Sequence, residues 1–335
     1  MRGIGVNYDT GLLYDGRSTR RRFATATVRE ELRLIADELH APAVRVSGND
    51  LDRLVLAGTA ALDAGLELWF SPVPMDLEPD QFIEFLVECA VAAETLRARG
   101  DVVLVLGCEL SVFCTGFVPG ESSGERIAAM TDPATFADPA KLSQLQAGML
   151  RWTEVQQRLV AAARAAFGGR ITYAAGMWEE VDWSLYDLVA VDAYRDAQNA
   201  ESFADELRER ARWGKPVVAT EFGCCAYRGA AARGGAGWMI VDRSVDPPVL
   251  NGSYERDEQE QVTYLQELVA ELDRVGLDGA FWFSFAGYEL PHRPDDPAHD
   301  LDISSYGLVA VDELGERRPK AVYGALAELN RALRQ

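Results

Sequence analysis

Short apolar segments alternate with longer amphipathic segments along the whole chain, and this alternation limits the possible folds more than any other feature. Eight short segments have the composition of buried strands: 2–8, 41–47, 66–72, 101–109, 170–178, 187–194, 216–222 and 279–285. The longer segments have apolar residues at helical spacing: 27–39, 49–65, 79–100, 142–169, 203–214, 257–276 and 318–333. We interpret the pattern as eight strands, each followed by a helix. It predicts an α/β fold, a single (β/α)8 TIM barrel over residues 1–335.

A doubly wound open sheet is the alternative arrangement of the same elements. Such a sheet binds nucleotides through a glycine-rich turn that follows a strand. Neither a GxGxxG nor a GxxxxGK[ST] motif follows any of the eight apolar segments. The barrel is therefore favoured.

Three connections are too long and polar to be simple links between elements. They follow the fourth, seventh and eighth strands and span residues 115–141, 225–257 and 286–309. In a barrel, loops that follow strands gather at the C-terminal face, where barrel enzymes keep their active sites. Long loops on this face predict a covered substrate cleft.

Composition excludes several classes of partner. Lys and Arg total 33 against 53 acidic residues, a net charge of −20, which disfavours nucleic acid and anionic membranes as partners. No apolar run is long enough to span a bilayer, and the start lacks a signal-peptide pattern, so we expect a cytoplasmic protein that acts on a small molecule. Five cysteines without CxxC spacing and only three histidines predict neither a metal site nor a cofactor.

Polar residues at the ends of the predicted strands are the candidates for chemistry, because side chains there point into the mouth of a barrel. Two glutamates, an arginine and several aromatic side chains on one face match the requirements for cleaving a glycosidic bond. One carboxyl group protonates the leaving oxygen while the other attacks the sugar or activates water. The candidates are Asn7, Asp9, Arg45, Asn49, Glu109, Trp178, Glu179, Tyr194, Glu221 and Trp282.

In these segments the chain resembles clan A of the glycoside hydrolases, and GVNYDTG (5–11) is similar to the start of actinobacterial glycosidase-like proteins. The segments that carry the clan resemblance are VRVS, VVLVLGCEL, DLVAVDAY, VVATEFG and GAFWFSF. The resemblance implies that Glu109, at the end of the fourth strand, is the acid/base and that Glu221, at the end of the seventh, is the nucleophile. It also implies that Arg45 and Tyr194 lie beside the nucleophile and that Trp282 floors the sugar subsite.

One residue departs from the clan's pattern. The clan has Asn-Glu at the end of the fourth strand, with the Asn contacting the sugar 2-hydroxyl, whereas this chain has Cys108-Glu109. A thiol is a poor substitute for an amide as a hydrogen-bonding group. Three explanations are open: the substrate differs at that position, another residue such as Asn49 compensates, or catalysis is weak or lost.

The sequence therefore predicts a retaining glycosidase or transglycosidase that acts on a small β-glycoside or an equivalent equatorial linkage. A sugar-binding pseudoenzyme on the same barrel is the main alternative. The acidic segment 295–302 suggests a further alternative, a metal-assisted hydrolase, but a solvated lid loop is the favoured interpretation of that segment. Trp178, Tyr194 and Trp282 are interpreted either as sugar platforms or as core residues, and Glu179 as a ligand for a sugar hydroxyl.

Overall fold

Eight parallel strands form a closed barrel, as the alternation predicts. The structure is a computed structural model, and it describes all residues except 2, 15 and 335. The barrel strands in chain order are β1 (Ile4–Asp9), β4 (Ala43–Gly48), β5 (Glu67–Pro72), β6 (Val102–Cys108), β7 (Arg170–Gly176), β8 (Val189–Asp192), β9 (Val217–Phe222) and β12 (Gly279–Trp282). Each strand pairs with the next along the chain, and β12 pairs with β1 to close the barrel.

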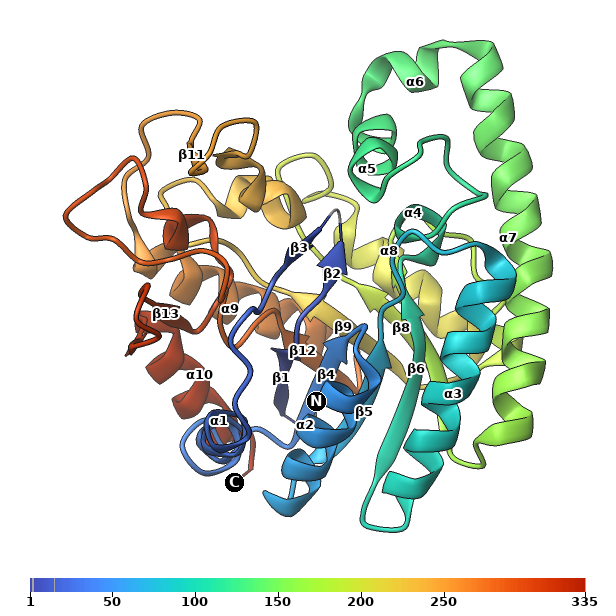
Figure 1. The fold of residues 1–335 in the computed structure, drawn as a ribbon, viewed down its shortest axis with the longest axis horizontal. Coiled ribbons are helices and arrows are strands. Elements are labelled where there is room, and N and C mark those ends of the chain that lie inside the picture. Colours follow the sequence, from blue (N-terminus) through green and yellow to red (C-terminus); the bar gives the residue numbers. More distant parts are fainter. Residues whose placement is uncertain (2, 15, 335) are drawn as a thin grey trace.

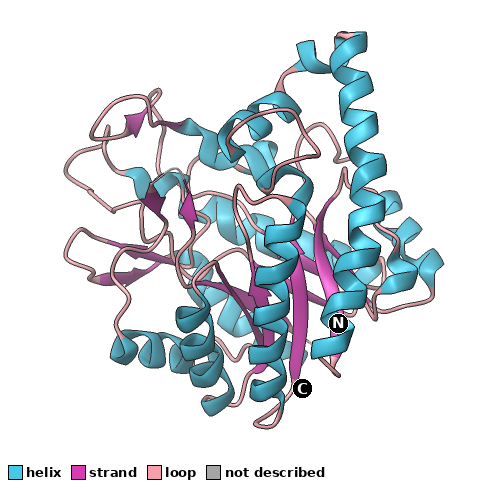
Figure 2. Cartoon of the chain, turned by 45° about the vertical axis from the view of Figure 1, so that its right-hand side comes forward, coloured by secondary structure: helices cyan, strands magenta, loops and turns pink. Residues whose placement is uncertain are grey.

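Helices surround the barrel, as Figures 1 and 2 show. The main helices are α1 (Thr25–Asp37), α2 (Leu51–Asp63), α3 (Pro79–Arg97), α7 (Pro139–Ala166), α8 (Phe203–Arg210), α9 (Glu258–Arg274) and α10 (Ala321–Leu333). Their starts follow local signals: Asp50 caps α2 by accepting the Arg53 amide, and α3 has a capping box and Pro79 in its first turn.

The expectation of a helix after every strand is wrong at one place. Between β7 and β8 the chain forms only a short 3-10 helix, η1 (Trp183–Leu185). Trp183 and Tyr186 are buried there in the main core, and the Lys215 ammonium group donates to the backbone carbonyls of residues 183, 184 and 186. Burial of these two aromatic side chains covers the barrel wall at this point, where a helix would otherwise lie.

The three long connections lie where they were expected, but they are more ordered than simple loops. The first, which α4 (Leu110–Phe113) precedes, contains α5 (Ser123–Thr131) and α6 (Pro133–Ala137). Helix α6 projects from the body beside the upper end of α7 (Figure 1). The second contains η3 (Ala231–Ile240), β10 (Val241–Asp242) and β11 (Val249–Leu250). The third contains η4 (Leu301–Ser304) and leads into β13 (Val309–Val311), which pairs with β14 (Arg317–Pro319). The remaining short elements are β2 (Leu13–Tyr14), β3 (Arg17–Ser18) and η2 (Ala211–Trp213).

The barrel has an apolar interior separate from the layer between strands and helices. A compact cluster that includes Trp69, Val103, Val218 and Phe281 fills the interior. The residues next to these along each strand belong instead to the large cluster that packs against the helices. Gly5 has no side chain because the Phe281 ring occupies that space, at 2.5 Å from the position a Cβ would take.

The ends of the chain are joined by a buried amide. The Asn330 side chain on α10 accepts the Ile4 amide at 2.7 Å and donates to the carbonyls of Ile4 and Leu39 at 3.0 Å each. This fixes the last helix against the first strand and the end of α1. Within the described residues, no helix combines the length and the apolar character needed to cross a bilayer.

Candidate active site

Glu221 points into the barrel mouth because of a β-bulge in β9. Along β8, Val191 and Asp192 are consecutive, whereas their partners on β9 are Ala219 and Glu221. Thr220 is therefore an extra residue, and such a bulge redirects the side chain that follows it. With strict alternation Glu221 would share the helix-facing side of Ala219; the bulge turns it inward instead.

A second bulge lies in β6, the strand that precedes the other candidate carboxylate. Val105 and Cys108 on β6 pair with Thr172 and Ala174 on β7, so β6 has one more residue between the two pairs. Gly107 adopts φ +91° within this bulge, a conformation that disfavours side chains. As a result Cys108 joins Val103 and Val105 in the barrel interior.

Glu109 follows this bulge in a left-handed conformation, with φ 43° and ψ 41°. Its amide donates to Ala174 at 2.9 Å, and the next turn is held by Tyr173, whose hydroxyl accepts the Leu110 amide at 2.6 Å. A glutamate in the left-handed region is uncommon, and such residues cluster at functional sites. The backbone here is fixed on both sides of Glu109.

Glu221 is held by a cation and a hydroxyl. Arg45 Nη1 donates to Glu221 Oε1 at 2.6 Å, and the Tyr194 hydroxyl donates to Oε2 at 2.9 Å. Arg45 is itself buried and fixed, because Nε donates to Ser71 at 3.0 Å and Nη1 to Asn7 Oδ1 at 3.0 Å. A guanidinium group at this distance stabilises the ionised form of the carboxylate.

Glu109 has the opposite environment. Burial raises the pKa of the Glu109 carboxyl well above its usual range, and the neighbouring carboxyl groups of Asp192, Glu221 and Glu179 raise it further. Arg45 opposes this rise only weakly, since it is the smallest of these influences. None of the hydrogen bonds in the described part of the chain involves the Glu109 carboxylate, so it is free to act on a bound molecule.

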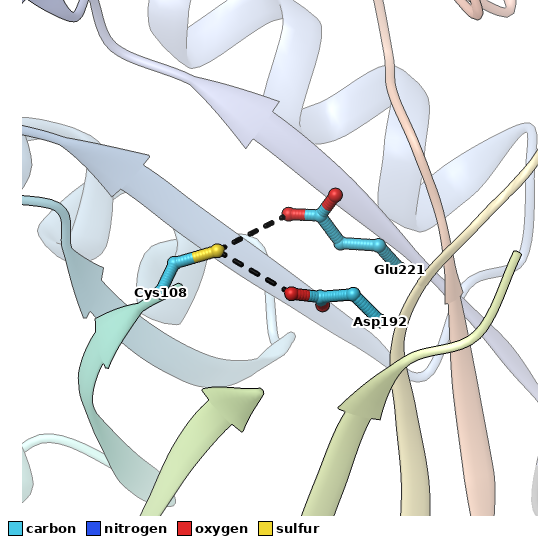
Figure 3. A group of neighbouring side chains, drawn as sticks. All are labelled: Cys108, Asp192 and Glu221. Carbon is cyan, nitrogen blue, oxygen red and sulfur yellow. Dashed lines mark hydrogen bonds between the residues drawn. The ribbon is translucent and has the colours of Figure 1, made fainter. Parts of the chain in front are cut away.

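Asp192 and Cys108 complete the polar layer beneath Glu221 (Figure 3). Cys108 Sγ lies 3.5 Å from Asp192 Oδ2 and 3.8 Å from Glu221 Oε1, and the ligand atoms of all three residues lie within 4.8 Å of one another. A thiol and two carboxylates at this spacing are donors that could hold a metal ion. Arg45, which already binds the same Glu221 oxygen, opposes a second cation there.

Asp192 lies near the end of the sixth predicted strand, but no role in the site was predicted for it. Its signal was the period-2 pattern of DLVAVDAY, which places Asp192 and Ala190 on one side of β8 and Val189 and Val191 on the other. An aspartate on the inner side of a barrel strand is costly to bury unless it has partners. That pattern was sufficient to place it in the mouth.

Two predicted sugar-binding residues lie away from the mouth, and those predictions need correction. Trp282 is fully buried; its ring packs on Phe222, and its indole nitrogen donates to the Tyr306 carbonyl at 2.9 Å. The side chain thus faces the helical layer and offers no surface to a sugar. Phe283, the next residue, is half-buried and packs on Tyr306, which in turn packs on Tyr194, the tyrosine bound to Glu221.

Glu179 is the other corrected residue. It is buried, and its carboxylate accepts hydrogen bonds from the Ser111 hydroxyl and amide, the Tyr173 hydroxyl and the Gly176 amide. These bonds use its oxygens to fix the turn after Glu109, so Glu179 supports the site and does not reach a substrate. Burial raises the pKa of this carboxyl to about 7, against the lowering effect of those hydrogen bonds.

Four other predicted residues occupy supporting or peripheral positions. Asn7 is buried and orients Arg45, while Asn49 bonds both backbone groups of Leu13 at 2.9 Å and so cannot replace the clan's missing amide. Asp9 accepts the Gly11 amide at 2.7 Å at the end of β1. Trp178, after β7, is 47% exposed and available for stacking.

The acidic segment 295–302 is engaged by protein cations. Asp300 and Asp302 bind Arg256 at 2.8 and 2.9 Å, and Asp302 also binds the buried Lys320 at 3.0 Å. Asp296 pairs with His299 at 2.9 Å. These contacts make the segment an ion-pair network that anchors the last long loop, and they leave little of it to ligate a metal.

The fold is that of known glycoside hydrolases. No family model and no curated protein sequence matches the chain. Among solved structures, the β-glycosidase BGL167 matches with a TM-score of 0.56 and 14% identity over 99% of this chain and 96% of that one. A β-glucuronidase from Ruminococcus gnavus matches with a TM-score of 0.55 and 15% identity over 97% of this chain and 48% of that one. A mutant of Bacteroides uniformis β-glucuronidase 2 matches with a TM-score of 0.57 and 15% identity over 97% and 34%.

These similarities confirm the clan A-like barrel that the sequence resemblance implied. At such identities they establish the architecture, and the chemistry depends on the residues described above.

Proposed function

We propose that the protein is a retaining glycosidase in which Glu221 is the nucleophile and Glu109 is the acid/base. The observation that carries this proposal is the contrast between the two carboxyl environments. Glu221 is paired with a guanidinium group and a tyrosine, whereas no cation among the described residues bonds Glu109, whose pKa is raised. An ion-paired carboxylate beside a buried carboxyl group without a bonded cation is the pattern of a nucleophile and an acid.

The reaction follows from these assignments. Protonated Glu109 donates its proton to the leaving glycosidic oxygen while ionised Glu221 attacks the anomeric carbon and forms a glycosyl ester. Glu109, now ionised, then removes a proton from water, which attacks the anomeric carbon and releases Glu221. Attack by a sugar hydroxyl at this second step would make the enzyme a transglycosidase.

The proposed substrate is a small soluble glycoside with a β or equivalent equatorial linkage, handled by one catalytic barrel in the cytoplasm. The net charge of −20 supports a small-molecule substrate over nucleic acid or an anionic membrane. The half-buried Phe283 and the exposed Trp178 are the aromatic surfaces we assign to sugar stacking.

Hydrolysis of a panel of aryl β-glycosides by wild type, Glu221→Gln and Glu109→Gln tests the proposal. Glu221→Gln loses activity on the whole panel by orders of magnitude, whereas Glu109→Gln loses it to that extent only on glycosides with basic leaving groups. Glu180→Gln, which alters an exposed glutamate near the site, serves as the matched control. Azide separates the roles: it restores turnover of Glu221→Ala with an α-glycosyl azide as product, and of Glu109→Ala with a β-glycosyl azide. Full activity in Glu221→Gln would refute the assignment.

A sugar-binding pseudoenzyme is the second candidate, and Cys108 favours it. Its thiol lies among Asp192 and Glu221 and is only 5% exposed, so it offers a substrate little in place of an amide. In that case no glycoside in the panel is hydrolysed, but sugars raise the temperature of thermal unfolding and Phe283→Ala abolishes that rise.

A further inference from the structure

The Cys108 thiol contacts two carboxylates but has one proton to donate. Cys108 Sγ lies within hydrogen-bonding distance of oxygens from both Asp192 and Glu221. A thiol carries one proton, so it can donate to only one of them. Glu221 already accepts bonds from Arg45 and Tyr194, which leaves Asp192 as the group in need of a partner.

Among the described residues, no cation forms a hydrogen bond or ion pair with Asp192. Its side chain is 4% exposed, and its Oδ1 atom has no hydrogen-bond partner by geometric criteria among the described residues. The bonds of Arg45 go to Ser71, Asn7, the Thr220 carbonyl and Glu221, with none to Asp192 in the part of the chain that the structure describes. An ionised carboxylate at this burial would be strongly unfavourable.

Two carboxylates this close cannot both be ionised with a single cation between them. Oxygens of Asp192 and Glu221 lie within 4.8 Å, in a layer shared with one guanidinium group. Like charges at such a separation force a proton onto one of the pair. Glu221 has Arg45 and is the more exposed of the two, with 14% of its side chain accessible, so the proton belongs on Asp192.

We propose that Asp192 is a positioning residue of this site: it is protonated at neutral pH and, as a neutral acid, leaves Arg45 paired with Glu221 alone. Burial, followed by the charge of Glu221, raises the pKa of Asp192 well above its usual range, which agrees with this geometry. The titratable and charged groups that face Asp192 come from the surrounding strands β4, β6, β8 and β9: Arg45, Cys108, Glu109, Tyr194 and Glu221. From β7 the partner is Gly176, which adds no charge.

The protonation state is tested first without any substrate, by unfolding the full chain in urea with a chelator present. A carboxyl that holds its proton in the folded state and loses it on unfolding makes the protein less stable as pH rises. Between about pH 5 and about pH 7, the unfolding constant of wild type relative to Asp192→Asn should therefore rise about tenfold per pH unit. Ser71→Ala is the matched control, because it removes a buried polar group of the same layer that does not titrate, and its ratio to wild type should stay constant. A constant ratio for Asp192→Asn as well would overturn the proposal.

Infrared spectroscopy gives a second readout that needs no altered Asp192. In protein labelled with carbon-13 at aspartate side-chain carboxyls, a protonated carboxyl band at neutral pH should shift with the label. Asp9, whose pKa is also raised by burial, is the competing source, so the band must persist in Asp9→Asn. Absence of a labelled protonated band in Asp9→Asn at neutral pH would refute protonation of Asp192.

The positioning role rests on the proposed function and has its own readout. If ionisation of Asp192 and loss of the Glu109 proton each stop the reaction, kcat/KM of wild type falls about a hundredfold per pH unit on the far alkaline side, and that of Asp192→Asn about tenfold. Equal slopes would refute the positioning role. The unfolding and infrared results hold whether or not a glycoside is hydrolysed, so failure of the proposed function is distinguishable from failure of this inference.

Discussion

Replacing Arg45 by methionine tests whether the site depends on one buried cation. Arg45 is 1% exposed and binds Glu221 at 2.6 Å, Ser71 at 3.0 Å and Asn7 at 3.0 Å. Methionine fills a similar length of space without charge, so it leaves Glu221 without a cation and Asn7 Oδ1 without a donor. Removing one partner of a buried ion pair costs about 3–5 kcal/mol, and an orphaned buried acceptor adds about 1 kcal/mol or more. We expect the free energy of unfolding to fall by about 4–6 kcal/mol.

Urea unfolding at neutral pH, followed by circular dichroism, measures this loss. The double variant Arg45→Met/Glu221→Gln removes the unpaired charge, and we expect it to be more stable than Arg45→Met alone by about 2 kcal/mol. A loss below about 1 kcal/mol in Arg45→Met would refute the reasoning, because the cation would then contribute little to the fold. Strict additivity of the two substitutions would show that the residues do not interact.

Three further predictions concern the acid, the sugar platform and the closure of the fold. Glu109 acts in its protonated form, which its raised pKa preserves, so kcat/KM should fall as pH rises through that pKa. Glu109→Gln should keep most activity on aryl glycosides with acidic leaving groups and little on those with basic ones. Phe283→Ala should raise KM by about three- to tenfold. Trp282→Phe should lower the temperature of thermal unfolding and leave KM unchanged. A raised KM in Trp282→Phe with an unchanged KM in Phe283→Ala would restore Trp282 as the sugar platform. Asn330→Ala removes three buried hydrogen bonds and should lower the free energy of unfolding, measured in urea, by about 3 kcal/mol. A loss under about 1 kcal/mol would contradict the role of Asn330 in fixing α10 to β1.

The sequence by itself determined the barrel, its strands and the face of the barrel on which the candidate residues gather. Each of the eight predicted segments overlaps one barrel strand, and only β1 and β4 extend past their segments, by one residue each. The agreement arises because alternation between apolar and amphipathic segments reflects local burial that each segment carries in its own composition. The resemblance to clan A also implied the pairing of Arg45 and Tyr194 with Glu221, and both contacts are present in the structure.

Only the tertiary structure decided which side chains face the mouth. The bulges at Thr220 and around Gly107 shift the alternation of β9 and β6 by one residue, and such shifts arise from pairing with neighbouring strands and leave little local signal. Without the strand registers, the sequence predicts Trp282 as the sugar platform, although Phe283 lies beside the site. It also predicts Glu179 as a sugar ligand, although that side chain is buried beneath Glu109. Composition sets which segments are buried, but the registers between strands decide where each carboxylate points.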